Sequence, residues 1–282
     1  MYTTLIKPAE LAATLGDRHW AILDCRFDLA QPGWGESVYA AAHIPAAQYA
    51  HLERDLAGAV TPASGRHPLP KLAHWSATLA RWGIDAHTQV IAYDQGSGAY
   101  AARLWWLMRW AGHARVAVLD GGFAAWTAAH LAVTSATQPR ASTTSSARAP
   151  KLATFATEDI EPALRDKRIL LVDARAADRF AGENESIDPV AGHIPGATNQ
   201  PFMQNLDVAG RFLPAPELAR RWQALLGARP ASELVAMCGS GVTACHNLLA
   251  LEIAGLSGAR LYPGSWSEWI RDPARGVARG AA

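Results

Sequence analysis

Cysteine, long apolar runs and an excess of either charge are all scarce in this chain. Its 282 residues include only three cysteines, an odd number that argues against a disulfide framework and favours a reducing compartment. Its apolar runs are too short to span a bilayer, and the amino-terminal residues lack the pattern of a signal peptide. The 26 basic and 25 acidic residues form no basic run, which disfavours nucleic acid as a partner. We therefore expect a cytoplasmic protein that does not associate with membranes.

What the chain does contain is a repeat. Four segments of the first half recur in the same order in the second half, at offsets from 143 (Trp126 to Trp269) to 150 (His43 to His193). They pair "AILDCRF" with "LLVDARA", "AAHIPAAQ" with "AGHIPGAT", "VIAYDQGSG" with "LVAMCGSG", and "LDGGFAAW" with "LYPGSWSEW". A repeat of this length indicates a duplicated domain rather than a solenoid.

A segment between the two halves has the composition of a linker. Residues 134–150, "TSATQPRASTTSSARAP", are rich in Ser, Thr, Ala and Pro and show no apolar periodicity. We predict a first domain at residues 1–135, an exposed linker at 136–150 and a second domain at 151–282.

Within each half, short apolar runs alternate with helical patterns, which indicates α/β domains, each with a mostly parallel sheet flanked by helices. The expected strands are residues 22–23, 90–93 and 116–119, then 170–172, 234–237 and 259–262. The expected helices are residues 70–82, 99–111, 215–226 and 242–254, with Pro216 in a first turn and Gly83, Gly112, Gly227 and Gly255 at helix ends.

A cysteine at the end of an apolar run is the main candidate for chemistry. Residues 234–246, "LVAMCGSGVTACH", place Cys238 directly after a predicted strand, at the sheet edge where α/β proteins bind ligands. Glycines at 239 and 241 allow the loop N–H groups to turn inward as an anion-binding nest, and the helix that follows adds its positive end. Both effects favour the reactive thiolate. We interpret Cys238 as a nucleophile whose bound substrate contacts Gly239, Gly241, Val242 and Thr243.

Other interpretations of this loop remain open. Free cysteine is among the most buried residue types, so Cys238 is alternatively a structural residue. Phosphatase or arsenate-reductase chemistry is disfavoured, because Ala244 stands where a cysteine phosphatase carries the arginine that binds phosphate. Thr243 either faces the bound sulfur or caps the following helix.

The other cysteines and two repeated histidines are expected to be structural. Cys245 follows Cys238 by about two helical turns and should pack within its helix rather than act as a resolving thiol. Cys25 ends the first strand, and His43 and His193 occupy matching "HIP" turns. No His, Cys, Asp and Glu cluster has metal-ligand spacing, and no dinucleotide or P-loop pattern occurs, so we expect no metal and no cofactor.

Taken together, the motifs "DARAADRF", the two "GHIPG"-like turns, "GRHPLP", "CGSGVTA" and "PGSWSEW" resemble the tandem-domain rhodanese family, the 3-mercaptopyruvate/thiosulfate sulfurtransferases, over nearly the whole chain. The resemblance implies two rhodanese-like domains, of which only the second keeps the catalytic cysteine. Cys238 then corresponds to Asp94 or Gln95 of the first half.

The resemblance also assigns further roles. The loop "CGSG" lacks the cations of thiosulfate-selective members and is similar to the mercaptopyruvate-using branch. There a serine, a histidine and an aspartate form a proton relay, which by motif places Ser240, His67 and Asp55 in those roles. A hydroxyl oriented by such a pair is suited to protonating a leaving enolate.

Donor binding is the point at which the sequence departs from the family. Arg179 matches the family's substrate-binding arginine. Many mercaptopyruvate-using members have a second arginine several residues later, where this chain has Ser186 and Ile187. Arg66 and Arg103 are candidates to replace that second cation.

These expectations describe a sulfurtransferase that works by double displacement. Cys238 takes sulfur from 3-mercaptopyruvate and passes it to cyanide or to a thiol such as thioredoxin or a low-molecular-weight thiol. The alternatives are a thiosulfate:cyanide sulfurtransferase of the same fold, or a non-catalytic persulfide carrier.

Overall fold

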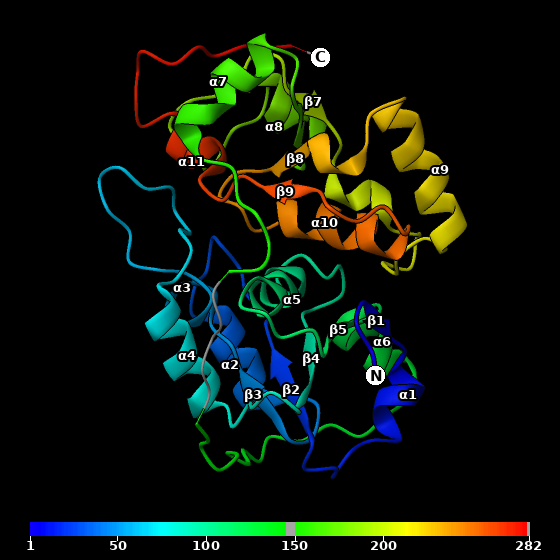
Figure 1. Ribbon diagram of the computed structural model, residues 1–282. Helices are drawn as coiled ribbons and strands as arrows, with labels where there is room; N and C mark the ends of the chain where they lie inside the picture. Colours follow the sequence, from blue (N-terminus) through cyan, green and yellow to red (C-terminus); the bar gives the residue numbers. More distant parts are fainter. Residues whose placement is uncertain (145–149, 281–282) are drawn as a thin grey trace. The chain divides into compact units, whose positions relative to one another are not determined.

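The computed structural model describes residues 1–144 and 150–280, and the chain divides into two compact units (Figure 1). The first unit comprises Met1–Gly58, Pro70–Leu152 and Val208–Phe212. The second comprises Ala59–Leu69, Ala153–Asp207 and Leu213–Ala282. By their contacts, two short segments thus belong to the unit formed mainly by the other half of the chain. The boundaries 1–135 and 151–282, which leave both segments in their own halves, stay a prediction.

The predicted linker is described only in part, because residues 145–149 lie outside the described residues. Residues 136–144 are mostly exposed, but they are held along the first unit. Arg140 Nη1 donates to the carbonyl of Trp20 at 2.7 Å, and the N–H of Thr143 donates to the carbonyl of Ala80 at 3.1 Å. These contacts tie the segment to the unit that precedes it in sequence.

The first unit is built on a five-stranded sheet with the order β1-β5-β4-β2-β3, in which all the pairings are parallel. Its strands are β1 Leu5–Ile6, β2 Trp20–Asp24, β3 Ala47–Tyr49, β4 Gln89–Tyr93 and β5 Val116–Leu119. Its helices are α1 Pro8–Ala12, α2 Trp34–Ala41, α3 Leu52–Asp55, α4 Leu72–Arg81, α5 Ala101–Trp110 and α6 Gly122–Ala128.

The second unit repeats this plan on a four-stranded parallel sheet with the order β7-β6-β8-β9. Its strands are β6 Leu170–Asp173, β7 Thr198–Asn199, β8 Leu234–Met237 and β9 Arg260–Leu261. Its helices are α7 Thr157–Arg165, α8 Ala177–Ala181, α9 Ala215–Leu226, α10 Ala244–Ile253 and α11 Ser265–Trp269, with short 3-10 turns at Phe202–Asn205 and Ala231–Glu233.

The central strands are apolar because helices cover both faces of each sheet. In the second unit, one core joins Val235 and Met237 of β8 to Ile160 of α7, Phe180 of α8 and Trp266 of α11. Helix α10 packs on β8 and β9 and also contacts α9. Figure 1 shows α7 and α11 together, and α9 and α10 together, beside the strands.

Sequence periodicity predicted the long central elements well. Every predicted strand overlaps an observed one, and each of the four predicted helices agrees with α4, α5, α9 or α10 to within two residues at either end. Short elements that lack a continuous apolar run, unlike β5 and β8, were not predicted, because so few residues cannot show a 3.6-residue or two-residue period. These are β1, β3, β7, α1, α3, α8 and α11; the longer helices α2, α6 and α7 were missed as well.

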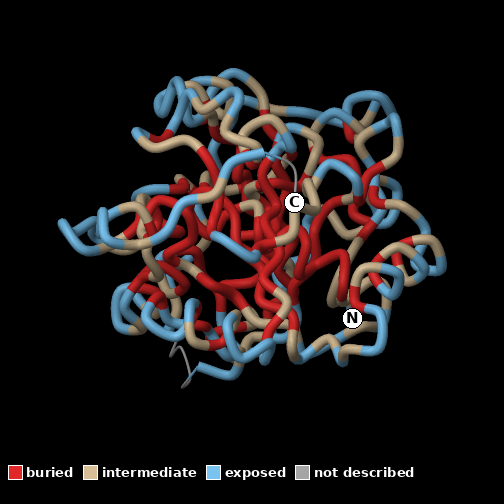
Figure 2. The backbone as a smooth tube through the Cα atoms, turned by 90° about the horizontal axis from the view of Figure 1, so that it is seen from above, coloured by how far each residue is buried: buried red, intermediate tan, exposed pale blue. Residues whose placement is uncertain are grey.

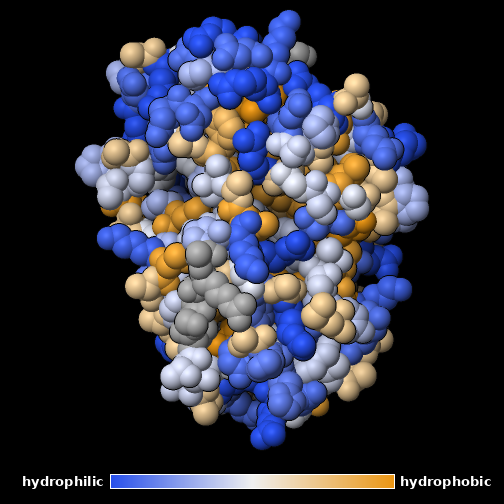
Figure 3. All heavy atoms as spheres, viewed as in Figure 1, coloured by the Kyte–Doolittle hydropathy of each residue, from blue (hydrophilic) through white to orange (hydrophobic). Residues whose placement is uncertain are grey.

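Buried backbone coincides with the strands and their flanking helices, and exposed backbone with the connecting loops (Figure 2). On the face shown in Figure 3, hydrophilic side chains are interspersed with hydrophobic ones. Among the described residues, no helix is both long enough and apolar enough to cross a membrane.

A buried ion pair stands at the same place in both units. It lies at the carboxyl ends of β2 and β6, where the "DCR" and "DAR" motifs begin. Arg26 donates to Asp24 at 2.6 Å, and Arg175 donates to Asp173 at 2.7 Å. All four side chains are buried, and the Arg175 guanidinium also lies over the Trp266 ring. A paired charge that has been removed from water is costly to leave without its partner.

Replacing Asp173 with Asn should therefore lower the free energy of unfolding by about 3–5 kcal/mol, because Arg175 keeps its buried charge and loses its main counter-ion. The matched control is Glu217→Gln, which breaks the exposed pair between Arg221 and Glu217. That change should cost at most about 0.5 kcal/mol. Urea unfolding of the three proteins measures both effects, and equal losses would contradict this account.

Candidate active site

Cys238 is the first residue after strand β8, at the carboxyl end of the second unit's sheet. Strand β8 is buried along its whole length, and the loop of residues 239–243 connects it to helix α10. The cysteine side chain is 2% exposed. The sequence thus places a thiol at the sheet edge where a ligand meets a helix amino terminus.

The conformation of the loop depends on Gly241. This residue has a φ of 76°, and a Cβ built on it would lie 2.5 Å from the carbonyl oxygen of Pro263. Only glycine fits both requirements. Within the described part of the chain, the N–H groups of Ser240, Val242 and Thr243 donate no hydrogen bond, so they are available to a ligand. Thr243 stands at the N-cap position of α10, but its side chain makes no capping hydrogen bond.

Three hydrogen bonds from helix α11 fix the backbone around the thiol. The N–H of Trp266 donates to the carbonyl of Cys238 at 3.0 Å, and that of Ser267 donates to the carbonyl of Gly239 at 2.8 Å. The N–H of Cys238 donates to Ser265 Oγ at 3.1 Å. Ser265 is a buried non-glycine residue with a φ of 54°, a strained conformation that these contacts hold in place.

The first unit contains the same loop with a carboxylate in place of the thiol. The strand registers pair Tyr93 with Asp24 and Met237 with Asp173, so the residues that follow, Asp94 and Cys238, are equivalent. This decides between Asp94 and Gln95 in favour of Asp94.

The Asp94 carboxylate shows what this loop binds. It is buried and accepts hydrogen bonds from four loop N–H groups, those of Gly96, Gly98, Tyr100 and Ala101, at 2.9–3.3 Å. Burial raises the pKa of Asp94, and the four N–H groups counteract that rise. The loop architecture therefore holds an anionic group in the first unit, which supports the interpretation of residues 239–243 as an anion nest.

A segment from the first half of the sequence completes the site. Residues 59–69 belong to the second unit, where His67 Nδ1 lies 2.7 Å from Ser240 Oγ. Both side chains are buried. The N–H of Gly65 donates to Glu268 Oε2 at 3.2 Å, and that of Arg66 donates to Ser267 Oγ at 3.0 Å. The structure thus brings together the predicted pair of Ser240 and His67.

The third member of the predicted relay, Asp55, is placed in the first unit. Its buried carboxylate accepts from Arg81 Nη2 at 2.6 Å and from the N–H of His51 at 2.8 Å. These contacts give Asp55 a structural role at the start of helix α3 and the end of α4. Its part in a relay stays a prediction.

Arg179 lies at the site but is already paired. Its Nε and Nη2 atoms donate to both oxygens of Glu185 at 2.8–3.2 Å, and Nη2 also donates to Asp188 at 3.2 Å. Burial alone would raise the pKa of Glu185, but hydrogen bonds from Arg179 and from the N–H groups of Asp188 and Ile187 lower it. Glu185 therefore remains a carboxylate that holds the Arg179 guanidinium in place.

The structure distinguishes between Arg66 and Arg103, the two candidates for a second cation. The Arg103 side chain is fully buried in the first unit, and its Nε and Nη2 donate to the carbonyl of Leu56. Arg66 lies beside the Cys238 loop: a Cβ built on Gly239 would be 3.0 Å from Arg66 Nη2 and 3.7 Å from Arg179 Nη2.

Sequence reasoning missed Ser265 and the two carboxylates Glu185 and Asp188. Ser265 had a detectable signal, because the first half carries Gly122 at the equivalent position and that glycine also has a positive φ. The carboxylates had none, since their role depends on partners that only the fold brings close.

The remaining candidates behave as the sequence indicated. Cys25 is fully buried, and burial together with the neighbouring Asp24, Asp94 and Asp55 carboxylates raises the pKa of its thiol well above the ordinary value. Cys245 is buried in α10, with Sγ 3.3 Å from the carbonyl of Gly241.

The two repeated histidines are tied to backbone and aromatic partners. His43 stacks on Tyr39 and bonds its carbonyl, and His193 does the same with Phe180. In the described residues, no group of three His, Cys, Asp or Glu side chains is arranged to hold a metal ion.

The requirement for glycine at position 241 is testable with a matched pair of variants. Gly255 has nearly the same φ, 74°, but an added Cβ there would meet nothing within 4 Å. Gly255→Ala should therefore cost only the strain of a positive φ, about 1 kcal/mol. Gly241→Ala adds the collision with Pro263 and should cost roughly 3 kcal/mol in unfolding free energy. Similar losses in denaturant titrations would refute the close approach.

A comparison with known protein families gives two matches, one in each half of the chain. The family model described as "Rhodanese-like domain" matches residues 7–129 and again residues 156–272. The two matches together include strands β8 and β4 and both equivalent loops.

Relatives match over nearly the whole chain. A protein of Pseudomonas aeruginosa named a probable 3-mercaptopyruvate sulfurtransferase is 49% identical over 278 residues, 98% of each chain. A protein of Mycobacterium tuberculosis whose name assigns it to the thiosulfate sulfurtransferases is 38% identical over 284 residues, 99% of this chain and 98% of the relative. The solved structure of a 3-mercaptopyruvate sulfurtransferase from Leishmania major superimposes with a TM-score of 0.85 at 32% identity, over 96% of this chain and 76% of that one.

Proposed function

The chain belongs to the rhodanese family and is a sulfurtransferase, and from this premise we propose that it takes sulfur from 3-mercaptopyruvate onto Cys238. The observation that carries the choice of donor is the contact between Ser240 Oγ and His67 Nδ1, at 2.7 Å. It places a hydroxyl with a proton source two residues beyond the thiol. Residues 239–243 themselves contain no cation, so this loop is suited to a donor whose leaving group needs a proton.

In the first half-reaction, the Cys238 thiolate attacks the sulfur of 3-mercaptopyruvate and a sulfur–sulfur bond forms. The carbon–sulfur bond breaks, and its electron pair leaves with the carbon as the enolate of pyruvate. Ser240 donates a proton to that carbon and is reprotonated from His67. This assigns the histidine tautomer with the proton on Nδ1. The loop N–H groups of residues 239–243 stabilise the thiolate before the attack and the persulfide after it.

In the second half-reaction, a thiolate acceptor attacks the outer sulfur of the persulfide. The sulfur–sulfur bond breaks, its electron pair returns to Cys238 as a thiolate, and the acceptor leaves as a persulfide. The acceptor is a low-molecular-weight thiol or a protein thiol such as thioredoxin, and cyanide leaves as thiocyanate. The cycle requires neither a metal nor a redox cofactor.

The second candidate function is thiosulfate sulfurtransfer by the same cysteine. One observation favours it: Arg66 and Arg179 both approach Gly239, so cations absent from the loop are supplied by neighbouring segments. The ratio of kcat/KM for 3-mercaptopyruvate to that for thiosulfate decides between the two donors. A ratio below one would identify thiosulfate as the preferred donor.

Replacing Cys238 with Ser should abolish sulfur transfer, because a serine hydroxyl cannot form the persulfide. Intact-mass measurement after treatment with 3-mercaptopyruvate should show the wild-type protein gaining one sulfur atom and the variant gaining none. Cys25→Ser is the control, since that thiol is buried in the first unit and should not alter the gain. Full pyruvate release by Cys238→Ser would contradict the mechanism.

Turnover separates an enzyme from a persulfide carrier. With excess thiol acceptor, the enzyme releases many pyruvate molecules per Cys238, whereas a carrier releases one. A single turnover under these conditions would favour the carrier.

The proton relay predicts a loss in kcat. Ser240→Ala and His67→Asn should each lower kcat for 3-mercaptopyruvate by roughly a hundredfold, the usual contribution of a positioned acid–base group, and the double variant should lose little more. Persulfide formation from a donor with a leaving group that needs no proton, such as thiosulfate, should be much less affected. Equal losses with both donors would argue against a relay.

The role of Asp55 is tested against its ion-pair partner. Asp55→Asn removes the carboxylate, whereas Arg81→Gln breaks the same ion pair and leaves the carboxylate in place. If Asp55 takes part in the relay, only Asp55→Asn lowers kcat. Equal kcat values in the two variants would leave Asp55 with its structural role alone.

A further inference from the structure

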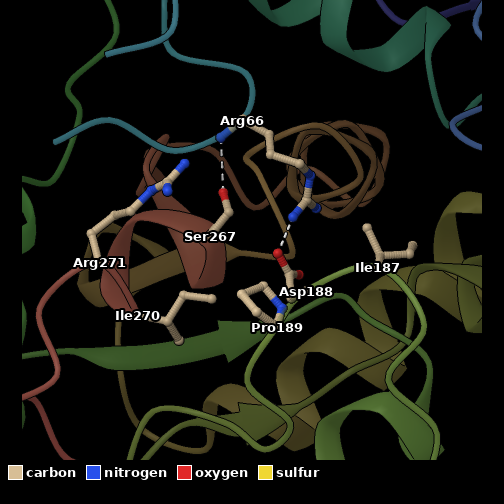
Figure 4. A pocket seen from close by; sticks show the side chains of 7 residues that line it. All are labelled: Arg66, Ile187, Asp188, Pro189, Ser267, Ile270 and Arg271. Carbon is tan, nitrogen blue, oxygen red and sulfur yellow. Dashed lines mark hydrogen bonds and ion pairs between the residues drawn. The ribbon is translucent and has the colours of Figure 1, made fainter. Parts of the chain in front are cut away.

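The Arg66 side chain extends from residues 59–69 to Asp188, and both residues line a pocket of about 190 Å³ (Figure 4). Its Nη1 atom forms the ion pair with Asp188 Oδ1 that the figure marks, and its backbone N–H is fixed by Ser267. The side chain is 27% exposed, whereas that of Asp188 is 1% exposed. Arg66 is therefore anchored at two points while part of it still faces open space.

The atoms of Arg66 that make no ion pair form one edge of the guanidinium. Its Nε is buried and has no hydrogen-bond partner among the described residues, and Nη2 is the atom that approaches Gly239. In an arginine, the N–H of Nε and one N–H of Nη2 point the same way and form the side-on fork that binds a carboxylate with two parallel hydrogen bonds. This fork is vacant in Arg66 and lies beside the thiol loop.

Arg179 has no such fork to offer. The same pair of atoms, Nε and Nη2, is already bound to the two oxygens of Glu185. Asp188 lies between the two guanidiniums and accepts from both, through Oδ1 and Oδ2. Burial raises the pKa of Asp188, and the two arginines oppose that rise. Arg179 and Asp188 thus position the cluster, and Arg66 retains its donors.

A buried N–H without a partner is costly. The Nε atoms of Arg140 and Arg260 are also without a partner in the described residues, and that of Arg66 points to a ligand because it lies beside the Cys238 loop. The ligand must be small, must carry an anionic group with two oxygens for the fork, and must reach Cys238 from Gly239. A 2-oxo acid meets all three conditions, because its carboxylate matches the fork while its third carbon bears the sulfur.

We propose that Arg66 binds the donor's carboxylate through its Nε–H and Nη2–H groups, as the second cation that the segment after Arg179 does not supply. This rests on the proposed function, since it names the residue that holds a 2-oxo acid donor at Cys238. Arg66 touches the substrate, and Asp188 orients Arg66.

The test compares three variants of the full chain. Arg66→Gln removes the charge and the fork, Arg66→Lys keeps the charge and the pair with Asp188 but has no fork, and Asp188→Asn breaks the ion pair while leaving the fork intact. We expect Arg66→Gln to raise KM for 3-mercaptopyruvate roughly 10- to 100-fold with little change in kcat, since the carboxylate is remote from the reacting bond. Arg66→Lys should recover only part of the loss. Asp188→Asn loosens the orientation of Arg66 but keeps the fork, so it should raise KM by much less than Arg66→Gln does.

A purely structural ion pair would make Arg66→Gln and Asp188→Asn raise KM equally, and that result overturns the proposal, as does an unchanged KM in Arg66→Gln. Calorimetric binding of pyruvate, which has the carboxylate but no sulfur, separates this outcome from a failure of the proposed function. Pyruvate binding that weakens in Arg66→Gln supports the carboxylate site even if 3-mercaptopyruvate is not the donor. The carboxylate site at Arg66 is refuted if the wild-type protein does not bind pyruvate, or if the wild-type protein and Arg66→Gln bind it equally well.

Discussion

The candidate site depends on how residues 59–69 pack on helix α11 of the second unit. Gly65 lies so close to this helix that an added Cβ would be 2.6 Å from the carbonyl oxygen of Gly264. The N–H groups of Gly65 and Arg66 are bound by Glu268 and Ser267. Once the segment is fixed in this way, His67 meets Ser240 and the Arg66 side chain is directed over Gly239. The same helix donates two backbone hydrogen bonds to residues 238 and 239, so one element positions the thiol, the hydroxyl's partner and the cation.

The duplicated architecture explains why a thiol can be reactive in one unit and absent from the other. In the first unit, the loop after β4 closes on the Asp94 carboxylate, whose four N–H bonds satisfy the loop from within the protein. In the second unit, the residue at this place is Cys238, and within the described residues the N–H groups of Ser240, Val242 and Thr243 donate no hydrogen bond. These three N–H groups therefore remain available to a bound sulfur or substrate. Both units thus share one fold, but the loop after β4 encloses a carboxylate of the chain itself, whereas the loop after β8 has N–H groups that are open to a ligand.

Sequence alone predicted the parts of the site that depend on local pattern. Apolar runs identified β8, the glycines identified the loop, and periodicity identified α10, because each signal is contained in a few consecutive residues. Arg66 and Asp188 are 122 residues apart, and neither has a local signal that would pair them. The expected replacement for the missing cation could be narrowed to two arginines, but only the fold shows that one approaches Gly239 while Arg103 is buried elsewhere. The motif resemblance, in turn, linked His67 to Ser240 before any contact was visible.

The charges around Gly239 are balanced, which limits how a donor is held. Arg66, Arg175 and Arg179 face Asp173, Glu185 and Asp188, three cations against three carboxylates. These six groups therefore present no excess of positive charge to an incoming anion, and Arg271, which also lines the pocket, adds a further positive charge. Specificity for the anion must come from directed hydrogen bonds, for which the Arg66 fork and the N–H groups of Ser240, Val242 and Thr243 are available among the described residues. Directed donors require two acceptor oxygens at the right spacing, so the Arg66 fork accepts a planar carboxylate and also a tetrahedral oxyanion. The Arg66 fork thus holds the donor's anionic end, whereas the choice of donor rests on the proton that the Ser240–His67 pair supplies to the leaving group.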